Sequence, residues 1–345
     1  MSPVRAFALM SAVLPLLHGV QAGFDPGSSN NVAVYWGQNS YGKSTGEYVQ
    51  KRLEYYCDSS DIDVLQLSFL TTINGPGGAP EVNFANASDN CTLFEGTSLL
   101  NCPQIGADIK TCQKKGKTIL LSIGGATYSE GGFNSDAAAQ AGAKLLWETF
   151  GPVPSGNSSV KRPFGDAVID GFDLDFEAVV RHMPAFANQL RKYYTEDSSK
   201  TYYLTAAPQC PYPDQADKEM LDGTVSFDAI WIQFYNNFCG LNSFEPGKDK
   251  QTHFNFETWD EWAHNTSLNK KVKVYVGAPG NTGAAGSGYV DVSRVKEIVQ
   301  YVKKFSSFGG VMIWDASQVY ANNGFLSGVK EAVGSSKSVA REFVA

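Results

Sequence analysis

Histidine is scarce in this chain, with only four among 345 residues, and the six cysteines include no Cys-x-x-Cys pair. Structural zinc sites draw on such ligands at short, regular spacings, so the sequence gives little support to a metal site. Basic residues are also in the minority, because 28 lysines and arginines stand against 35 aspartates and glutamates for a net charge of −7. A nucleic-acid surface needs an excess of positive charge, and we therefore expect no nucleic-acid partner.

Long apolar runs are missing after the first residues. A membrane-spanning helix needs about 20 apolar residues, and no later segment approaches that length, so we expect no membrane partner. The start is typical of a secretory signal peptide, because Arg5 precedes an apolar run over 6–17, and Val20-Gln21-Ala22 suits cleavage after Ala22. A buried N-terminal helix is the alternative, but polar, turn-rich sequence follows at once. We predict a leader over 1–22 and a secreted, monomeric chain over 23–345.

The cysteines agree with secretion. An even number of them behind a signal peptide favours three disulfides, although the residues alone do not choose among the many possible pairings. Four N-x-S/T sequons point the same way. The cysteines are Cys57, Cys91, Cys102, Cys112, Cys210 and Cys239, and the sequons are at Asn86, Asn90, Asn157 and Asn265.

Short apolar runs recur along the whole chain, and most are continuous in apolar character, as parallel strands covered by helices should be. Eight strands are predicted, over 32–35, 64–69, 118–122, 171–176, 201–206, 229–234, 273–277 and 310–314. Helical patterns lie between many of them. One runs from the capping-box pattern Ser44-x-x-Glu47 to Tyr56, and a second covers 136–150. A third begins at Pro184, and a fourth covers 292–305.

This alternation of eight strands with helices predicts an α/β fold, a closed (β/α)8 TIM barrel. An open doubly wound sheet is the alternative, but no G-x-G-x-x-G follows the first strand. No Pro/Ser/Thr-rich linker divides the chain, so we expect one catalytic domain over 23–345. Only 278–309 separates the last two strands and most of its second half is helix, so no α+β insertion is expected there.

The most informative segment is the acidic strand over 170–177, with the sequence D-G-F-D-L-D-F-E. Residues two apart on a strand share a face, so Asp173, Asp175 and Glu177 point one way and the large apolar residues point the other. The apolar face belongs against the helices. The carboxyl groups should therefore line the barrel axis, with Glu177 at the C-terminal mouth where barrel enzymes keep their chemistry. Like charges this close favour a shared proton, which suits acid–base catalysis.

Two alternatives are weaker. A calcium loop would use these three acids as its first ligands, but the position that requires glycine is Ala178 and the one that requires glutamate is Pro184. An edge strand with a polar, solvated face does not suit the Phe/Leu alternation between flanking helices. Catalysis is the better interpretation of this segment.

The D-x-x-D-x-D-x-E pattern at a strand end resembles the signature of family 18 glycosidases, and the mature chain resembles their single-domain, class III plant and fungal chitinases. Each further matching segment is weak alone, but together they span nearly the whole chain. They are Tyr35-Trp36-Gly37-Gln38-Asn39, Leu121-Ser122-Ile123-Gly124-Gly125, Gln233-Phe234-Tyr235-Asn236-Asn237 and Gly310-Val311-Met312-Ile313-Trp314-Asp315.

The resemblance implies an endo-acting, retaining chitinase in which the 2-acetamido group of the substrate is the nucleophile and an oxazolinium ion forms. Glu177 is then the general acid and base, Asp175 orients the acetamido group, Asp173 shares a proton with Asp175, and Tyr235 donates a hydrogen bond to the acetamido oxygen. Trp314 is the expected floor of the subsite beside the scissile bond. No metal or organic cofactor is implied.

The resemblance implies further features. Secondary binding candidates, by motif position, are Tyr35, Gln38, Asn83, Gly125, Gln233 and Asn236. Asp170 is out of register with the other acids and is expected to brace the strand entrance. The implied disulfides are Cys57–Cys112, Cys91–Cys102 and Cys210–Cys239. The implied cis peptide bonds are Ser68–Phe69, Glu177–Ala178 and Trp314–Asp315.

Two other functions remain as alternatives. A silent barrel that binds sugar or inhibits another enzyme typically lacks one of the terminal acids or the tyrosine, and here Glu177, Asp175 and Tyr235 are all present. An endo-N-acetylglucosaminidase acting on N-glycans uses the same chemistry, but the class III resemblance over the whole chain argues against it.

Overall fold

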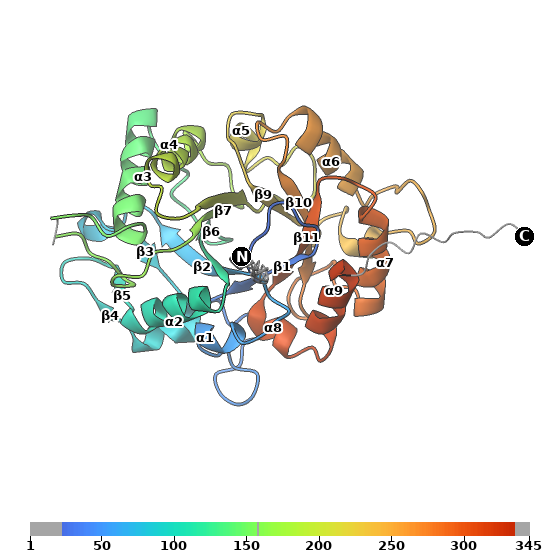
Figure 1. Ribbon diagram of the computed structural model, residues 1–345, viewed down its shortest axis with the longest axis horizontal. Helices are drawn as coiled ribbons and strands as arrows, with labels where there is room; N and C mark the ends of the chain where they lie inside the picture. The colour runs from blue at the N-terminus through green and yellow to red at the C-terminus, as the bar shows by residue number, and fades with distance from the viewer. Residues whose placement is uncertain (1–22, 157–158, 335–345) are drawn as a thin grey trace, which may run out of the picture.

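A computed structural model of the protein describes residues 23–156 and 159–334, in which eight parallel strands close into a barrel (Figure 1). Pairing of β1 with both β2 and β11 closes the ring. The predicted (β/α)8 TIM barrel is therefore confirmed, and each predicted strand has its counterpart. The barrel strands are β1 (Asn31–Trp36), β2 (Val64–Thr72), β6 (Thr118–Gly124), β7 (Gly171–Asp175), β8 (Tyr203–Ala206), β9 (Ala229–Gln233), β10 (Lys273–Pro279) and β11 (Phe308–Trp314).

Helices surround the strand ring (Figure 1). The longer ones are α2 (Pro103–Lys114), α3 (Asp136–Phe150), α4 (Met183–Glu196), α6 (Phe256–Asn265), α7 (Val292–Val302) and α9 (Phe325–Gly334). The shorter ones are α1 (Leu53–Tyr56), α5 (Lys218–Leu221), α8 (Ala316–Tyr320) and the 3-10 turns η1 (Pro76–Gly78), η2 (Ala85–Asn90) and η3 (Leu241–Ser243). Three short strands lie between β2 and α2, namely β3 (Glu81–Val82), β4 (Thr92–Leu93) and β5 (Leu100–Asn101). Between β10 and β11 lie only loops and α7, so the expected lack of an α+β insertion is confirmed.

The helix predicted from the capping-box pattern at Ser44 is wrong over most of its length. Only Leu53–Tyr56 is helical, and the residues before it form turns and bends. Gly46 has a φ of 89°, outside the helical region. The side-chain oxygen of Gln50 accepts the backbone N–H of Gly37 at 2.9 Å, which ties this segment as a loop to the end of β1. A capping box is a local signal, and here tertiary hydrogen bonds outweigh it.

Two apolar layers build the core. The larger one lies between the strand ring and the helices and includes Phe172 and Leu174, which alternate with the acids of β7. The smaller one fills the barrel interior and contains several aromatic rings, among them Trp231 and Tyr275, whose centroids are 4.2 Å apart. Along β7, the apolar side chains therefore point into the larger layer, and the acids that alternate with them point into the barrel interior.

All six cysteines form disulfides, with the pairing that the resemblance implies. Cys57–Cys112 joins the end of α1 to α2, Cys91–Cys102 closes the loop that holds β4 and β5, and Cys210–Cys239 joins the loops after β8 and β9. The last of these crosslinks two loops at the C-terminal mouth of the barrel.

The peptide bonds Ser68–Phe69 and Trp314–Asp315 are cis, as the resemblance implies, whereas the bond Glu177–Ala178 is not among the cis bonds. That third expectation is wrong. Both of its residues lie beyond the end of β7 and are exposed, so no packing offsets the several kcal/mol that a non-proline cis bond costs.

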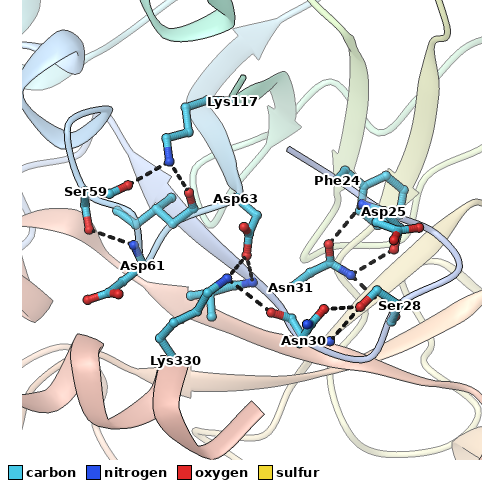
Figure 2. A network of polar contacts seen from close by, with 12 residues as sticks. Phe24, Asp25, Ser28, Asn30, Asn31, Ser59, Asp61, Asp63, Lys117 and Lys330 are labelled. Carbon is cyan, nitrogen blue, oxygen red and sulfur yellow. Dashed lines mark hydrogen bonds and ion pairs between the residues drawn. The ribbon is translucent and has the colours of Figure 1, made fainter. Parts of the chain in front are cut away.

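The N-terminal end of the barrel is closed by the segment that leads into β1 (Figure 2). Phe24 inserts its ring into the barrel, with centroids 4.7 Å from Tyr203 and 6.2 Å from Trp231. Its backbone N–H donates to Oγ1 of Thr118 at 2.9 Å, and the side-chain amide of Asn31 donates to the carbonyl of Asp25 at 2.9 Å. The segment is thus a structural part of the barrel floor.

Charged groups complete this floor (Figure 2). Lys330 of α9 donates to Oδ2 of Asp63 at 2.6 Å, and the same oxygen accepts the backbone N–H of Val32 at 2.7 Å. Lys117 donates to the carbonyls of Ser59 and Ile62 at 2.7 and 2.6 Å. These contacts tie the last described helix and the loop before β2 to the start of β1.

Replacement of Phe24 by alanine is expected to destabilise the protein by about 3–5 kcal/mol, because it removes a buried ring and leaves a cavity in the barrel floor. A fall in the midpoint of thermal unfolding measures the effect. Phe238→Ala is the matched control, since that ring is exposed and its loss should change stability by less than about 0.5 kcal/mol. Equal midpoints for Phe24→Ala and wild type would show that the floor segment does not stabilise the barrel.

Within the described ranges, no helix is both long enough and apolar enough to cross a membrane. The predicted leader over 1–22 and the sequon at Asn157 lie outside those ranges. Of the other sequons, Asn90 and Asn265 are exposed, whereas the amide nitrogen of Asn86 donates to the carbonyl of Gln50 at 3.0 Å.

Candidate active site

The carboxyl end of β7 carries the three acids of the predicted strand. Asp173 and Asp175 lie within β7 and are buried, whereas Glu177 follows the strand and is exposed at the mouth of the barrel. The acids therefore run from the barrel interior outward, in the order that their spacing predicts. A substrate in the mouth meets Glu177 first.

Asp173 accepts hydrogen bonds from side chains on four other strands. Its Oδ2 accepts from Tyr35 on β1 and Ser122 on β6, each at 2.7 Å, and its Oδ1 accepts from Thr205 on β8 at 2.6 Å and Trp231 on β9 at 2.9 Å. Burial raises the pKa of Asp173, and these four hydrogen bonds oppose that shift. A carboxylate has about four acceptor sites, so these donors occupy Asp173 fully and suit its ionised form.

Asp175 is in a less favourable place for a charge. Burial raises its pKa well above the ordinary value, and the charges of Glu177 and Asp173 raise it further. One hydrogen bond opposes this, from Nε2 of Gln233 to Oδ1 of Asp175 at 2.9 Å, and the same nitrogen donates to the carbonyl of Ala207 at 3.0 Å. Of the two buried acids of β7, Asp175 is therefore the one that holds a proton more readily.

Glu177 also has a raised pKa, because its carboxyl is partly desolvated at the mouth and Asp214 places a negative charge nearby. Asp214 is buried and accepts the backbone N–H groups of Gln209 at 3.0 Å and Asp217 at 2.7 Å. Sequence reasoning missed Asp214. The available signal was an acid in the loop that follows the next barrel strand.

Asp217 is a second acid that sequence reasoning missed. It is 1% exposed, and within the described part of the chain neither of its carboxyl oxygens has a hydrogen-bond partner. Burial raises its pKa well above the ordinary value, and the charges of Asp214, Asp173 and Glu177 add to this. An unpaired, buried carboxyl group favours its neutral form, and in its ionised form Asp217 raises the pKa of Asp175 further.

Tyr235 follows β9 and is buried beside these acids. Burial raises the pKa of its hydroxyl well above the ordinary value, and the charges of Asp175 and Glu177 raise it further. The hydroxyl therefore stays protonated and can act as a hydrogen-bond donor.

Trp314 ends β11 and forms an aromatic floor with its neighbours. It is half-buried, its ring stacks on Phe69 with centroids 5.8 Å apart at 21°, and it meets Tyr35 at 5.5 Å and 60°. Tyr35 lies beneath, fully buried, with its hydroxyl bonded to Asp173. In this position Tyr35 holds Asp173 in place, and its predicted contact with substrate stays a prediction.

The remaining binding candidates hold the loops of the mouth together. Gln38 donates to the carbonyls of Ser68 at 2.8 Å and Asn83 at 3.0 Å, which links the loop after β1 to β2 and to the residue that follows β3. The side chain of Asn83 is exposed. Asn236 is also exposed, and its Oδ1 accepts the backbone N–H of Gly286 at 2.8 Å.

Gly125 and Asp170 have structural roles, at the C-terminal end of β7 and just before its first residue. The N–H of Gly125 donates to the carbonyl of Asp175 at 2.7 Å, and a Cβ at Gly125, whose φ is 78°, would come within 2.8 Å of the Phe69 ring. Asp170 accepts the N–H of Ile119 at 2.7 Å and pairs with Lys200. Asp170 therefore braces the entrance of β7, as expected from its register.

In the described residues, no three histidine, cysteine or acidic side chains are placed to hold a metal ion. What the site can do is proton transfer. An exposed carboxyl of raised pKa lies above buried, charge-coupled acids, a tyrosine donor lies beside them, and an aromatic floor faces the mouth. On a barrel of this kind, that chemistry is typical of a glycoside hydrolase.

Comparison with known proteins gives the family. Glycosyl hydrolases family 18 matches residues 31–288. A protein named class III chitinase, from Arthroderma benhamiae, is 56% identical over 338 residues, which cover 98% of this chain and 96% of that protein. Endochitinase 33 of Trichoderma harzianum is 48% identical over 325 residues, which cover 94% of this chain and 98% of that protein. The chain belongs to glycosyl hydrolase family 18.

A protein with a different role shares the fold. The xylanase and alpha-amylase inhibitor protein from Scadoxus multiflorus is 31% identical, with a TM-score of 0.69, and the match covers 88% of this chain and 98% of that one. Because an inhibitor has this barrel, the barrel alone does not distinguish catalysis from inhibition. The side chains at the mouth must do so.

Proposed function

We propose that this protein is a secreted, endo-acting chitinase that hydrolyses β-1,4 bonds between N-acetylglucosamine units with retention at the anomeric carbon. The observation that carries the proposal is the pairing of Glu177, exposed at the mouth with a raised pKa, with the buried Asp175 beneath it. The names of the Arthroderma and Trichoderma relatives support the substrate. The predicted leader and the three disulfides support secretion.

In the first step, Glu177 donates its proton to the glycosidic oxygen while the 2-acetamido oxygen of the substrate attacks the anomeric carbon. The C–O bond breaks, the leaving sugar departs with the proton, and an oxazolinium ion forms. In the second step, Glu177 takes a proton from water, which attacks the same carbon from the face that the leaving group occupied. Two inversions give net retention.

The buried acids favour this route over attack by an enzyme carboxylate. Asp175 is held by Gln233, and neighbouring charges favour its protonated form, so it is a poor nucleophile. It suits instead a hydrogen bond with the acetamido N–H and stabilisation of the positive charge that develops. Asp173, whose acceptor sites are taken by four other donors, tunes Asp175 by its negative charge and not by the shared proton that the resemblance implies. Tyr235 donates to the acetamido oxygen.

Binding in the groove follows from the shape of the mouth. Trp314 stacks against the apolar face of the sugar beside the scissile bond, and Gln38, Asn83 and Asn236 border the groove. With only loops and α7 between β10 and β11, no added module forms a wall there, so a long chain can lie across the mouth and be cut internally.

The test is incubation of the purified mature protein with N-acetylglucosamine hexamer and, separately, with a high-mannose glycopeptide. We expect the hexamer to be cut at internal bonds and the initial products to have the β-anomeric configuration in NMR spectra. Cleavage of the glycopeptide alone would identify an endo-N-acetylglucosaminidase. Tight binding without cleavage would identify an inhibitor or lectin, and dimers released from one end only would contradict endo action.

The pH profile should depend on Asp214. Its negative charge raises the pKa of Glu177, and Glu177 must be protonated to act as the acid, so activity is lost as pH rises through that pKa. Asp214→Asn removes the charge, lowers the pKa of Glu177 and moves the basic limb of the kcat/KM profile to lower pH. Glu95→Gln, at an exposed acid, is the remote control. An unmoved basic limb in Asp214→Asn would remove Asp214 from this role.

A further inference from the structure

Glu177 lies on a loop between β7 and α4, residues 176–182, that a neighbouring loop holds in place. Glu177 and the two residues after it are exposed, so their own side chains fix their position only weakly. The neighbouring loop covers 125–135, between β6 and α3. Its first residue, Gly125, donates its N–H to the carbonyl of Asp175 at 2.7 Å. This bond fixes the chain just before Glu177.

The β6–α3 loop also fixes the chain after Glu177, through a second backbone contact. Arg181 forms a parallel bridge with Gly132. The N–H of Arg181 donates to the carbonyl of Gly131 at 3.1 Å, and the carbonyl of Arg181 accepts the N–H of Phe133 at 3.0 Å. The segment that carries the acid is therefore held on both sides by one loop.

The bridge forms only because residue 132 is glycine. Gly132 has a φ of 85°, and a Cβ there would lie 2.3 Å from the carbonyl oxygen of Arg181 and 2.4 Å from its nitrogen. Gly131 also has a positive φ, of 66°, but a Cβ there would meet nothing within 4 Å. The two neighbouring glycines thus share a backbone conformation that favours glycine, and only Gly132 is needed for close contact with the β7–α4 loop.

A side-chain contact lies directly after the bridge. His182 has a φ of 60°, in the left-handed region that residues other than glycine adopt at an energetic cost. Its Nδ1 lies 2.7 Å from Oδ1 of Asp136, in the first turn of α3. Strained residues of this kind persist where the surrounding structure fixes them, and they gather at functional sites. The strain at His182 therefore points to a role for the end of this loop.

Aromatic rings pack along the same two loops. Tyr128 meets Phe176 with centroids 5.0 Å apart at 61°, and Phe133 stacks on Phe186 of α4 at 5.6 Å and 24°. The helices α3 and α4 that follow the two loops also pack side by side (Figure 1). On its other side, the β6–α3 loop is anchored by Glu130, which accepts two backbone N–H groups that follow β2. The β6–α3 loop is thus itself a fixed support.

We propose that Gly132 and His182 are positioning residues that aim Glu177 at the glycosidic oxygen. Gly132 does so through its bridge to Arg181, and His182 through its contact with Asp136. This inference rests on the proposed function and adds to it the part of the fold that places the acid. Misplacement of a catalytic group by about 1 Å can cost about 100-fold in rate, so the loss belongs mainly in kcat.

Gly132→Ala is expected to lower kcat on N-acetylglucosamine hexamer by roughly 10- to 100-fold, because its methyl group pushes Arg181 and the loop away. KM and the hexamer affinity measured by calorimetry should stay close to wild type. Gly131→Ala is the matched control, since it carries the same cost of a positive φ without the clash, and its kcat should stay close to wild type. An equal fall of kcat in both variants would overturn the role of Gly132.

The pH profile of Gly132→Ala gives a readout that a loss of stability would not move. Partial desolvation raises the pKa of Glu177, and a loop freed from its support exposes that carboxyl further. The basic limb of the kcat/KM profile should therefore move to lower pH, although the substitution removes no titratable group. An unmoved limb together with an unchanged kcat would overturn the positioning role.

The contact between His182 and Asp136 decides the question if Gly132→Ala does not fold. His182→Gly relieves the left-handed strain but removes the ring, so kcat should fall roughly three- to tenfold while the unfolding midpoint does not fall. Asp136→Ala should lower kcat alike, and the double variant should lose no more than either, because the two side chains act as one unit. Asp136→Asn, whose amide can pair with the ring nitrogen in either tautomer, should restore kcat.

The outcomes separate this inference from the function on which it rests. Cleavage by wild type, with kcat unchanged in His182→Gly and Asp136→Ala, would overturn the positioning role of His182 alone. A fall in the unfolding midpoint that matches the fall in kcat would also overturn it, because the effect would then be one of stability. Failure of wild type to cleave the hexamer would overturn the proposed function, and the positioning roles with it.

Discussion

Glu177→Gln is expected to lower kcat on N-acetylglucosamine hexamer by about 100-fold or more, because the amide keeps the shape of the side chain but cannot donate the proton. Affinity for the hexamer should persist, since Glu177 lies at the mouth and is not part of the aromatic floor. Product chromatography measures the rate, and calorimetry with the variant measures the affinity. Equal cleavage by wild type and Glu177→Gln would show that another group is the acid.

Glu177 is exposed, so its replacement by glutamine should not disturb folding. The midpoint of thermal unfolding for Glu177→Gln should therefore match wild type, and a large fall would attribute the lost activity to structure. The raised pKa of Glu177 gives a second readout, because a carboxyl group that titrates in the catalytic range produces the basic limb of the pH profile. That limb should be absent from the residual activity of the variant.

Asp175→Asn is expected to lower kcat by roughly 100-fold. The asparagine oxygen can still accept the hydrogen bond from Gln233, so the side chain keeps its place, but the carboxyl group that faces the positive charge growing on the acetamido group is lost. Because that charge matters most in the transition state, kcat should fall much more than KM changes. Stopped-time assays over a range of hexamer concentrations separate the two constants.

Asp170→Asn is the matched control for this prediction. Asp170 begins the same acidic segment, but it accepts the N–H of Ile119 and pairs with Lys200 at the far end of β7. Its replacement should lower the unfolding midpoint and leave kcat unchanged. If Asp170→Asn and Asp175→Asn reduced kcat alike, the effect would belong to the strand as a whole and not to a carboxyl group beside the substrate.

Patterns within single strands proved the most predictable part of the fold. A strand buried between helices and a barrel interior must be apolar on its helix side, so the eight runs and the alternation on β7 could be read without knowledge of their neighbours. The helix expected after Ser44 failed because its signal covers four residues only, while Gln50 binds the end of β1. The Glu177–Ala178 bond failed because a resemblance in sequence does not include the packing that would offset a cis bond.

The residues of the site also fall into two groups, those that one strand supplies and those that only the fold brings together. Asp173, Asp175 and Glu177 were predictable because one strand supplies all three at a spacing of two. Asp214 and Asp217 were not, because only the fold brings the loop after β8 beside β7. Tyr35 was named from motif position alone, and only the structure shows that its ring is buried beside Trp314 with its hydroxyl bonded to Asp173.

The amino-acid order alone therefore decided which residues form strands, which face of β7 is acidic and which residues could transfer protons, since these depend on neighbours along the chain. Only the tertiary structure decided how those protons are held. The pKa of a buried carboxyl depends on burial, on donors and on charges within a few ångströms. For Asp173 those donors come from β1, β6, β8 and β9, and for Glu177 the charge comes from Asp214. These groups come from different strands and loops, so the distances between them are set only when the barrel closes.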